Sequence, residues 1–233
     1  MDFILNTPAL NVYEHMALDE TAVRLFDGGF WLRFYHWTPG PAVTFGYAQF
    51  ADQVEKELAQ KAVRAPYVRR PTGGGVVYHG DDLTFSCIFR PQETRPRDVY
   101  EKLHGLIRAG FCAQGLKARA FDERPPASAY APSAGHTASA CFVNPVENDL
   151  LAEDGRKILG GAIRRFGDTV LYQGSLQTPG ARTDERCRAA VIDAVRYGYA
   201  PGLTPRGASA ELLRHARELA RTQYQTERWI RKF

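Results

Sequence analysis

The spacing of apolar residues changes several times along the chain, and each change predicts a different element. Residues 12–26, VYEHMALDETAVRLF, place apolar side chains close to helical spacing with charged ones between them, which predicts an amphipathic helix. Residues 30–37, FWLRFYHW, are aromatic-rich and roughly alternating, and residues 42–50, AVTFGYAQF, follow a Pro-Gly-Pro sequence. These two stretches predict two strands joined by a turn.

The rest of the chain continues this mixture of patterns. Residues 95–116 predict a long amphipathic helix that ends at a glycine. Because strands and helices do not alternate regularly, the pattern favours an α+β fold over a doubly wound one. The other predicted elements are a short charged helix at 53–62, then a strand, glycine loop, strand, turn and strand at 67–89, short strands with turns at 141–176, and helices at 184–194 and 208–224.

Length and composition indicate an ordinary globular protein. A chain of 233 residues, 44% of them hydrophobic, suits one large domain or two small ones with a sizeable core. No apolar run approaches the roughly 20 residues that span a bilayer, and no cationic segment precedes the apolar N-terminal residues. The four cysteines lie far apart, which argues against a zinc site or a disulfide scaffold. We therefore predict a cytoplasmic protein that does not bind membranes.

Charge adds little to this picture. The net charge of +4 comes from scattered lysines and arginines, without a basic stripe between aromatics, so nucleic-acid binding is not predicted. A modestly positive surface suits an acidic protein partner, and the terminal WIRKF either docks on such a partner or lies on the surface. Residues 122–138 are rich in proline, alanine and serine, and form either a mobile loop or a lid that orders over a ligand.

The most informative short stretch is VRRPTGGGVVYH, residues 68–79. Three glycines allow positive φ and a close backbone approach to a ligand, and successive amides can bind an anion. Arg70 adds a cationic fork that suits a carboxylate or a phosphate. The stretch lacks the Gly-Lys-Ser/Thr of a Walker loop and does not open a helix as a dinucleotide fingerprint does. A glycine-rich hairpin turn with two surface arginines is the plainer alternative.

Two later stretches carry further candidates. In GRKILGGAIRR, Lys157 lies in an apolar strand beside glycines, so it is either a solvated edge lysine or an inward cation that neutralises negative charge. In CFVNPVENDLL, Cys141 is either a small buried side chain or a nucleophile. Asn148 and Asp149 form either a turn or oxygen ligands for Mg²⁺.

The order and spacing of four blocks resemble the lipoate–protein ligase and octanoyltransferase family, which shares its catalytic fold with biotin–protein ligases. The resemblance implies one catalytic domain over residues 1–233, with mixed, largely antiparallel sheets flanked by helices in a class II synthetase-like arrangement. The sequence departs from many long ligases of the family in ending at Phe233, soon after the matched blocks, so we expect no C-terminal accessory domain. The blocks are MALDE (16–20), the predicted hairpin that ends in Gly46 and Gln49, RRPTGGGVVYH, and GRKILGGAIRR with the following YQGSL.

The resemblance implies roles for individual residues. Lys157 matches the catalytic lysine of the family, which contacts the reacting carbonyl and the α-phosphate. Arg70 would hold a carboxylate or phosphate, and His79 matches a histidine after the glycine loop, with a structural role as the alternative. The matched blocks place the other predicted contacts with the acyl chain or acyl-AMP at Thr72, Gly73, Gly74, Gly75, Tyr78, Gly160, Gly161 and Ala162.

The family attaches lipoyl or octanoyl groups to one lysine of an acceptor domain, such as those of 2-oxoacid dehydrogenase E2 or the glycine cleavage H protein. Ligases activate lipoate with ATP and Mg²⁺. The triple glycine and the Asn148-Asp149 pair, which in ligases lies near the metal and phosphates, favour that mechanism. A separate accessory polypeptide completes some ligases, which makes it a candidate partner here.

One subgroup instead transfers octanoyl groups from an acyl carrier protein through a cysteine thioester. Cys141 with Phe142 and Pro145 resembles its cysteine block, and DDLTFS, residues 81–86, resembles its version of that stretch. We favour the ligase from the sequence and keep the Cys141 transferase as the alternative. A non-catalytic member that binds the acyl carrier or the acceptor is the third possibility.

Overall fold

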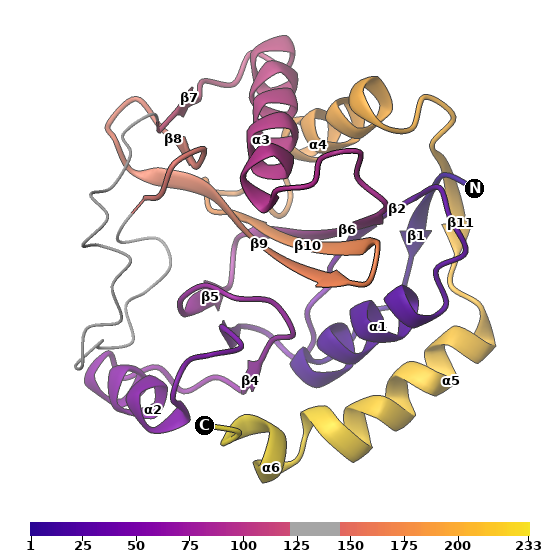
Figure 1. Cartoon of the computed structure of the whole chain (residues 1–233). Helices are drawn as coiled ribbons and strands as arrows, with labels where there is room; N and C mark the ends of the chain where they lie inside the picture. The colour runs from indigo at the N-terminus through magenta and orange to yellow at the C-terminus, as the bar shows by residue number, and fades with distance from the viewer. Residues whose placement is uncertain (122–144) are drawn as a thin grey trace.

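The computed structural model describes residues 1–121 and 145–233, and these residues form the predicted α+β fold on two sheets. The larger sheet runs through the centre of the molecule (Figure 1). Its first strand along the chain, β1, pairs in parallel with both neighbours, and all other neighbours pair antiparallel. In spatial order the strands are Thr204–Gly207 (β11), Phe3–Asn6 (β1), Phe30–Phe34 (β2), Leu83–Phe89 (β6), Thr169–Leu176 (β10), Lys157–Phe166 (β9), Leu150–Leu151 (β8) and Arg119–Ala120 (β7).

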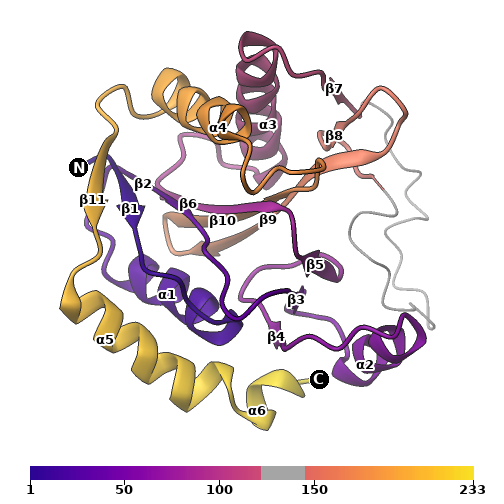
Figure 2. The same cartoon turned by 180° about the vertical axis from the view of Figure 1, so that it is seen from behind.

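Helices cover both faces of this sheet, as the two opposite views show (Figures 1 and 2). On one face lie α3 (Pro96–Ala113) and α4 (Glu185–Gly198), whose apolar side chains join the main core. On the other face lie α1 (Val12–Arg24) and α5 (Ala210–Leu219). Both faces of the central strands are therefore buried, and every residue of β6 and β10 is buried.

Local sequence explains where the first helix begins. The Asn11 side chain accepts hydrogen bonds from the amides of Tyr13 and Glu14, each at 3.0 Å. The Glu14 carboxylate accepts one in return from the Asn11 amide at 3.1 Å. This reciprocal capping satisfies amides that have no partner inside the helix. The helix predicted over 12–26 is confirmed, with its end at Arg24.

The smaller sheet contains three strands in the order β4 (Tyr67–Arg69), β3 (Ala42–Phe45) and β5 (Val77–His79). It packs on α2 (Ala51–Gln60), the predicted charged helix. The predicted pairing of 30–37 with 42–50 is wrong, because β2 pairs with β1 and β6 whereas β3 pairs with β4 and β5. Tyr35 and Trp37, between the two strands, are buried against α1, so the connection crosses from one sheet to the other.

The C-terminal segment is part of the fold. After α5 the chain continues through a π-helical turn (Ala220–Tyr224) into the short helix α6 (Glu227–Ile230), whose end lies near α2 (Figure 1). The fully buried Arg69 donates to the backbone oxygens of Trp229 at 2.9 Å and Ile230 at 2.6 Å. The terminal WIRKF therefore docks on its own chain. Among residues 1–121 and 145–233, no helix is long and apolar enough to cross a bilayer.

We expect Arg69→Ala to lower the free energy of unfolding by about 3 kcal/mol or more, because buried carbonyls on two segments lose charged donors. The Arg69 guanidinium also donates to the backbone oxygen of Gln49 at 2.7 Å, so it ties three parts of the chain together. Urea unfolding measures the change. Arg231→Ala is the matched control, since its partly exposed guanidinium pairs with the carboxylates of Asp52, Glu55 and Glu227 at the surface and should matter much less.

Candidate functional site

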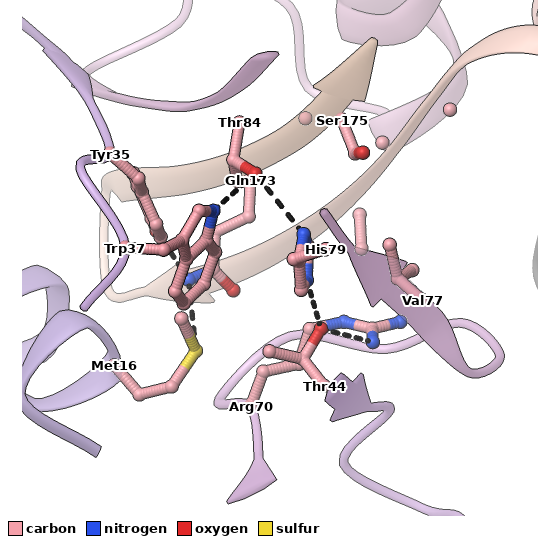
Figure 3. A pocket seen from close by; sticks show the side chains of 14 residues that line it. Met16, Tyr35, Trp37, Thr44, Arg70, Val77, His79, Thr84, Gln173 and Ser175 are labelled. Carbon is pink, nitrogen blue, oxygen red and sulfur yellow. Dashed lines mark hydrogen bonds between the residues drawn. The ribbon is translucent and has the colours of Figure 1, made fainter. Parts of the chain in front are cut away.

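A hollow of about 410 Å³, partly open to solvent, lies between the small sheet and the strands β9 and β10. We call it the inter-sheet hollow (Figure 3). Met16, Trp37 and Val77 contribute apolar side chains to its lining, and polar side chains from both sheets make up most of the rest. It is lined by Met16, Tyr35, Trp37, Thr44, Arg70, Val77, His79, Thr84, Gly160, Gly161, Ala162, Gln173, Gly174 and Ser175.

The glycine loop follows Arg70, which lines this hollow, and its Gly73 and Gly74 line a neighbouring hollow. Gly74 has a left-handed φ of +88°, which only glycine adopts at little cost. A Cβ on Gly46 would lie 1.8 Å from the Gly74 oxygen, so the loop passes directly over Gly46. The Gly46 amide donates to the Gln49 side chain at 2.8 Å. The Gly46 and Gln49 pattern of the sequence therefore serves the close passage of the loop.

Arg70 points into the inter-sheet hollow (Figure 3). Its Nε and one terminal nitrogen donate to the Gly73 oxygen at 3.0 and 2.5 Å, and the other terminal nitrogen donates to Thr44 Oγ1 at 3.4 Å. The guanidinium thus braces the glycine loop while it presents positive charge to the hollow. Arg70 therefore lines the hollow, and its contact with a carboxylate or phosphate stays a prediction.

His79 is buried in the same wall and has partners on both ring nitrogens. Its Nε2 lies 2.9 Å from Thr44 Oγ1, and its Nδ1 lies 2.9 Å from Asp82 Oδ2. Burial opposes ionisation of Asp82, but its attraction to His79 and its hydrogen bonds outweigh this and lower its pKa. His79 therefore lines the hollow and is also structurally satisfied, so its contact with substrate stays a prediction.

Two other predicted contacts lie elsewhere. Thr72 is fully buried and donates to Gln173 Oε1 at 2.7 Å, which fastens the glycine loop to β10. Tyr78 alternates with Val77 and His79 along β5, so it faces away from the hollow and donates to Glu57 of α2 at 2.7 Å. A direct contact of Tyr78 with a ligand in this hollow is not supported by the geometry.

Behind the hollow lies a buried polar network that the sequence did not reveal. Asp19 of α1 accepts from Arg33 Nε at 3.0 Å and from Gln173 Nε2 at 2.8 Å. Ser86 donates to the same carboxylate at 2.9 Å. Charged residues inside the buried runs MALDE and FWLRF were the available signal, because such charges are rarely buried unless they are paired. The network fixes Gln173 at the wall of the hollow.

A second hollow, which we call the lysine-side hollow, continues from the first. It holds about 550 Å³ of empty space, partly open to solvent. Gly161 and Ala162 line both hollows, so the two meet at the middle of β9. Its lining is Gly73, Gly74, Tyr100, Val146, Glu147, Asp149, Gly161, Ala162 and Ile163.

Lys157 lies in the interior beside this second hollow. Its Nζ is 2.8 Å from Asp149 Oδ2, and the two side chains are only 3% and 4% exposed. Burial raises the pKa of Asp149, although Lys157 acts against that rise. Because β9 is paired with β10 on one side and β8 on the other, the solvated edge lysine is excluded. Lys157 is therefore an inward cation, paired with a carboxylate that lines the lysine-side hollow.

The predicted Mg²⁺ ligands do not form a metal site on their own. Asp149 Oδ2 accepts from the Val146 amide at 2.6 Å as well as from Lys157. Asn148 has a left-handed φ of +73°, as in a tight turn. Across residues 1–121 and 145–233, no group of three or more His, Cys, Asp and Glu side chains could hold a metal ion. These donors do not fit a preformed Mg²⁺ site, and we derive no step through a metal.

Cys141 and the proline-rich stretch 122–138 lie outside the described residues. The chain re-enters the described structure at Pro145, and Val146 and Glu147 then line the lysine-side hollow. Together the two adjoining hollows combine apolar side chains with the Arg70 guanidinium in the first and the Asp149 carboxylate, paired with Lys157, in the second. Such a site suits an apolar chain with an electron-rich head group.

His104 makes the free energy of unfolding depend on pH, because burial in the core lowers the pKa of its imidazole to about 4. The unfolded chain binds this proton near pH 6.5, so the contribution of the neutral imidazole is complete above pH 6.5 and is lost as the pH falls towards 4. We expect a loss of about 3 kcal/mol of unfolding free energy across that interval. Urea unfolding at several pH values measures it, and a His104→Leu variant should lack this component of the slope.

Comparison with known proteins places these features in one family. The model of the lipoyl protein ligase A/B catalytic domain matches residues 11–183. The octanoyltransferase LipM of Moorella thermoacetica is 34% identical, over 74% of this chain and 63% of its own length. The LipM of Symbiobacterium thermophilum is 37% identical, over 70% of this chain. The chain thus spans about 60% of the length of these two relatives.

Other comparisons extend over whole chains. The octanoyltransferase LipM of Brevibacillus brevis is 30% identical over 96% of both chains. Among solved structures, the putative lipoate protein ligase Ta0514 of T. acidophilum with bound lipoic acid superposes with a TM-score of 0.76 at 21% identity, covering 100% of both chains. A lipoate-protein ligase A bound with ATP gives the same TM-score and identity over 98% of both. These structures confirm the predicted fold.

Proposed function

Because this chain belongs to the lipoyl protein ligase A/B catalytic-domain family, we propose that it moves an octanoyl group from a carrier thioester to a lysine of a lipoyl acceptor domain. The observation that carries the proposal is the buried ion pair of Lys157 with Asp149. Asp149 lines the lysine-side hollow together with Gly73 and Gly74, and this hollow adjoins the inter-sheet hollow. Similarity to LipM octanoyltransferases over nearly whole chains supports the transferase over the ligase that the sequence favoured.

The proposed reaction has two displacements. The acyl chain lies along Met16, Trp37 and Val77, and its carbonyl lies where the two hollows meet. The Cys141 thiolate attacks this carbonyl, the carrier thiolate leaves and takes up a proton, and an octanoyl thioester forms on the enzyme. The acceptor lysine, as a neutral amine, then attacks that thioester, loses a proton and releases the Cys141 thiolate. In both steps the Lys157 ammonium stabilises the negative charge on the carbonyl oxygen.

ATP-dependent attachment of lipoate is the second candidate. Arg70 gives the inter-sheet hollow a cationic group that suits a carboxylate or phosphate, and Gly73 and Gly74 of the glycine loop line the adjoining lysine-side hollow. In this alternative the enzyme forms lipoyl-AMP before the acceptor lysine attacks. In this alternative Mg²⁺ must arrive with the nucleotide and be held largely by its phosphates. Among the ion pairs of the described residues, Asp149 is the only carboxylate that pairs with Lys157, so the protein offers few ligands of its own. Only in this alternative would a separate accessory subunit be a partner.

A two-arm assay with an E2-type or H-type acceptor domain separates the candidates. One arm contains octanoyl carrier protein without ATP, and the other contains lipoate, ATP and Mg²⁺. We expect octanoylated acceptor in the first arm, observed by intact mass. Lipoylation with pyrophosphate release in the second arm alone would identify a ligase. If acceptor or carrier binds without modification in either arm, the protein is a non-catalytic member.

A further inference from the structure

Tyr172 and His104 form a polar connection through the main core that the proposed reaction does not use directly. Gly161 and Gly174 are opposite each other in β9 and β10. A Cβ on Gly161 would lie 2.4 Å from the Tyr172 hydroxyl, and one on Gly174 would lie 2.7 Å from the Tyr172 ring. These two glycines therefore leave the space that the fully buried Tyr172 ring occupies.

The ring directs its hydroxyl towards α3, which lies over this part of the sheet (Figure 1). The Tyr172 oxygen is 2.8 Å from His104 Nε2, and His104 Nδ1 is 2.7 Å from the Asn148 carbonyl oxygen. A carbonyl oxygen only accepts, so Nδ1 carries the hydrogen. In the neutral ring Nε2 then accepts from the tyrosine hydroxyl. The two bonds assign the tautomer and give His104 one donor and one acceptor role.

The Asn148 carbonyl that accepts from His104 belongs to the turn that also contains Asp149. The Asp149 amide donates to the Val146 oxygen at 2.9 Å, and the Val146 amide donates back to the Asp149 carboxylate at 2.6 Å. Asn148 adopts its left-handed conformation between them. The orientation of the Asp149 carboxylate, and hence the place of the Lys157 ammonium 2.8 Å away, depends on the shape of this turn.

We propose that Tyr172 and His104 are positioning residues that hold Asp149, and through it Lys157, in the geometry that acyl transfer requires. The proposal rests on the proposed function for the role of Lys157. These contacts run from Gly161, which lines both hollows, through Tyr172 and His104 to the turn that carries Asp149. They fix both ends of the reacting region relative to each other.

Most residues around this connection are apolar, as Val99, Leu103 and Ile107 of α3 show. A buried imidazole costs free energy unless both nitrogens have partners. Here both ring nitrogens of His104 have partners, so the hydrogen bonds between Tyr172, His104 and Asn148 form a satisfied and rigid connection. Small misplacements of a reacting group can cost as much as about 100-fold in rate, which is the size of effect expected if the connection sets the position of Lys157.

Three variants test the proposal. His104→Leu keeps a similar volume but loses both hydrogen bonds, and we expect the rate of octanoyl transfer to fall about 10- to 100-fold with little change in KM for the octanoyl carrier. His104→Asn retains a donor near the Nδ1 position and should recover most of that loss. Leu103→Ala, one residue earlier in the same core, should lower stability without lowering the rate in the folded enzyme.

A second measurement does not depend on activity. In His104→Leu, hydrogen exchange of the Asn148 and Asp149 amides, which donate to Phe121 and Val146 in the wild type, should become at least about 10-fold faster than in Leu103→Ala. Wild-type rate and wild-type exchange in His104→Leu would overturn the proposal. If the wild type shows no transfer, the proposed function fails, and faster exchange in His104→Leu still supports the positioning of the turn.

Discussion

Lys157→Ala is expected to lower the rate of acyl transfer at least about 100-fold, as the loss of an oxyanion donor does in other acyl-transfer enzymes. The Lys157 ammonium is buried in its ion pair with Asp149, which lines the lysine-side hollow, so alanine at this position removes the positive charge from the site. Single-turnover transfer from octanoyl carrier protein to the acceptor domain measures the effect. KM for the carrier should change little, because the lost interaction forms in the transition state.

The variant also leaves Asp149 unpaired in the interior, which can cost about 3–5 kcal/mol of stability. Loss of activity could then reflect loss of fold. The double variant Lys157→Ala with Asp149→Asn removes the uncompensated charge and should recover most of the unfolding free energy while the rate stays low. A stable double variant with near-normal turnover would remove Lys157 from the mechanism.

Local signals predicted the elements that depend on neighbours in sequence. The helical spacing of the apolar residues from Val12 onwards placed α1 correctly, and the structure shows that Asn11 and Glu14 cap its start. The order of strand, glycine loop, strand, turn and strand at 67–89 was also confirmed in β4, β5 and β6. These features depend on hydrogen bonds and side-chain spacing within a few residues, so they are visible in the sequence alone.

Which sheet a strand joins depends on contacts that sequence spacing does not contain. The pairing of β2 with β3 was predicted because a turn lay between them, yet burial of Tyr35 and Trp37 against α1 separates them. Lys157 could be read as an edge or an interior residue. Lys157 is an interior residue because β8 pairs with the outer side of β9, and β8 has only two residues and no recognisable sequence pattern.

The supporting residues of the site were even less visible. His104 lies on the apolar face of α3, so its spacing in the sequence predicts only a buried core histidine. Its partners are 44 residues away in Asn148 and 68 residues away in Tyr172, so only the folded chain brings them together. The glycine block of 160–161 was recognised, but the reason for Gly161 is the ring of Tyr172.

Cys141→Ser is expected to abolish transfer from octanoyl carrier protein, with a loss of at least about 1000-fold, because a hydroxyl without an activating base is a far weaker nucleophile than a thiolate. Incubation of the wild type with octanoyl carrier protein, without acceptor, should add the mass of one octanoyl group to the enzyme. Peptide mapping should place that group on Cys141. Cys112→Ser is the matched control, since Cys112 is an exposed free cysteine on α3 and should leave the rate unchanged.

The same variant separates the two mechanisms because they need different leaving groups. In lipoyl-AMP the activated carbonyl already carries a good leaving group, so the acceptor lysine attacks without a protein nucleophile, and Cys141→Ser would retain ATP-dependent lipoylation. In octanoyl transfer the thioester must first pass to the enzyme, so the variant has no route to product. A fully active Cys141→Ser enzyme with octanoyl carrier protein would therefore contradict the covalent mechanism, while an active Lys157→Ala enzyme would contradict both.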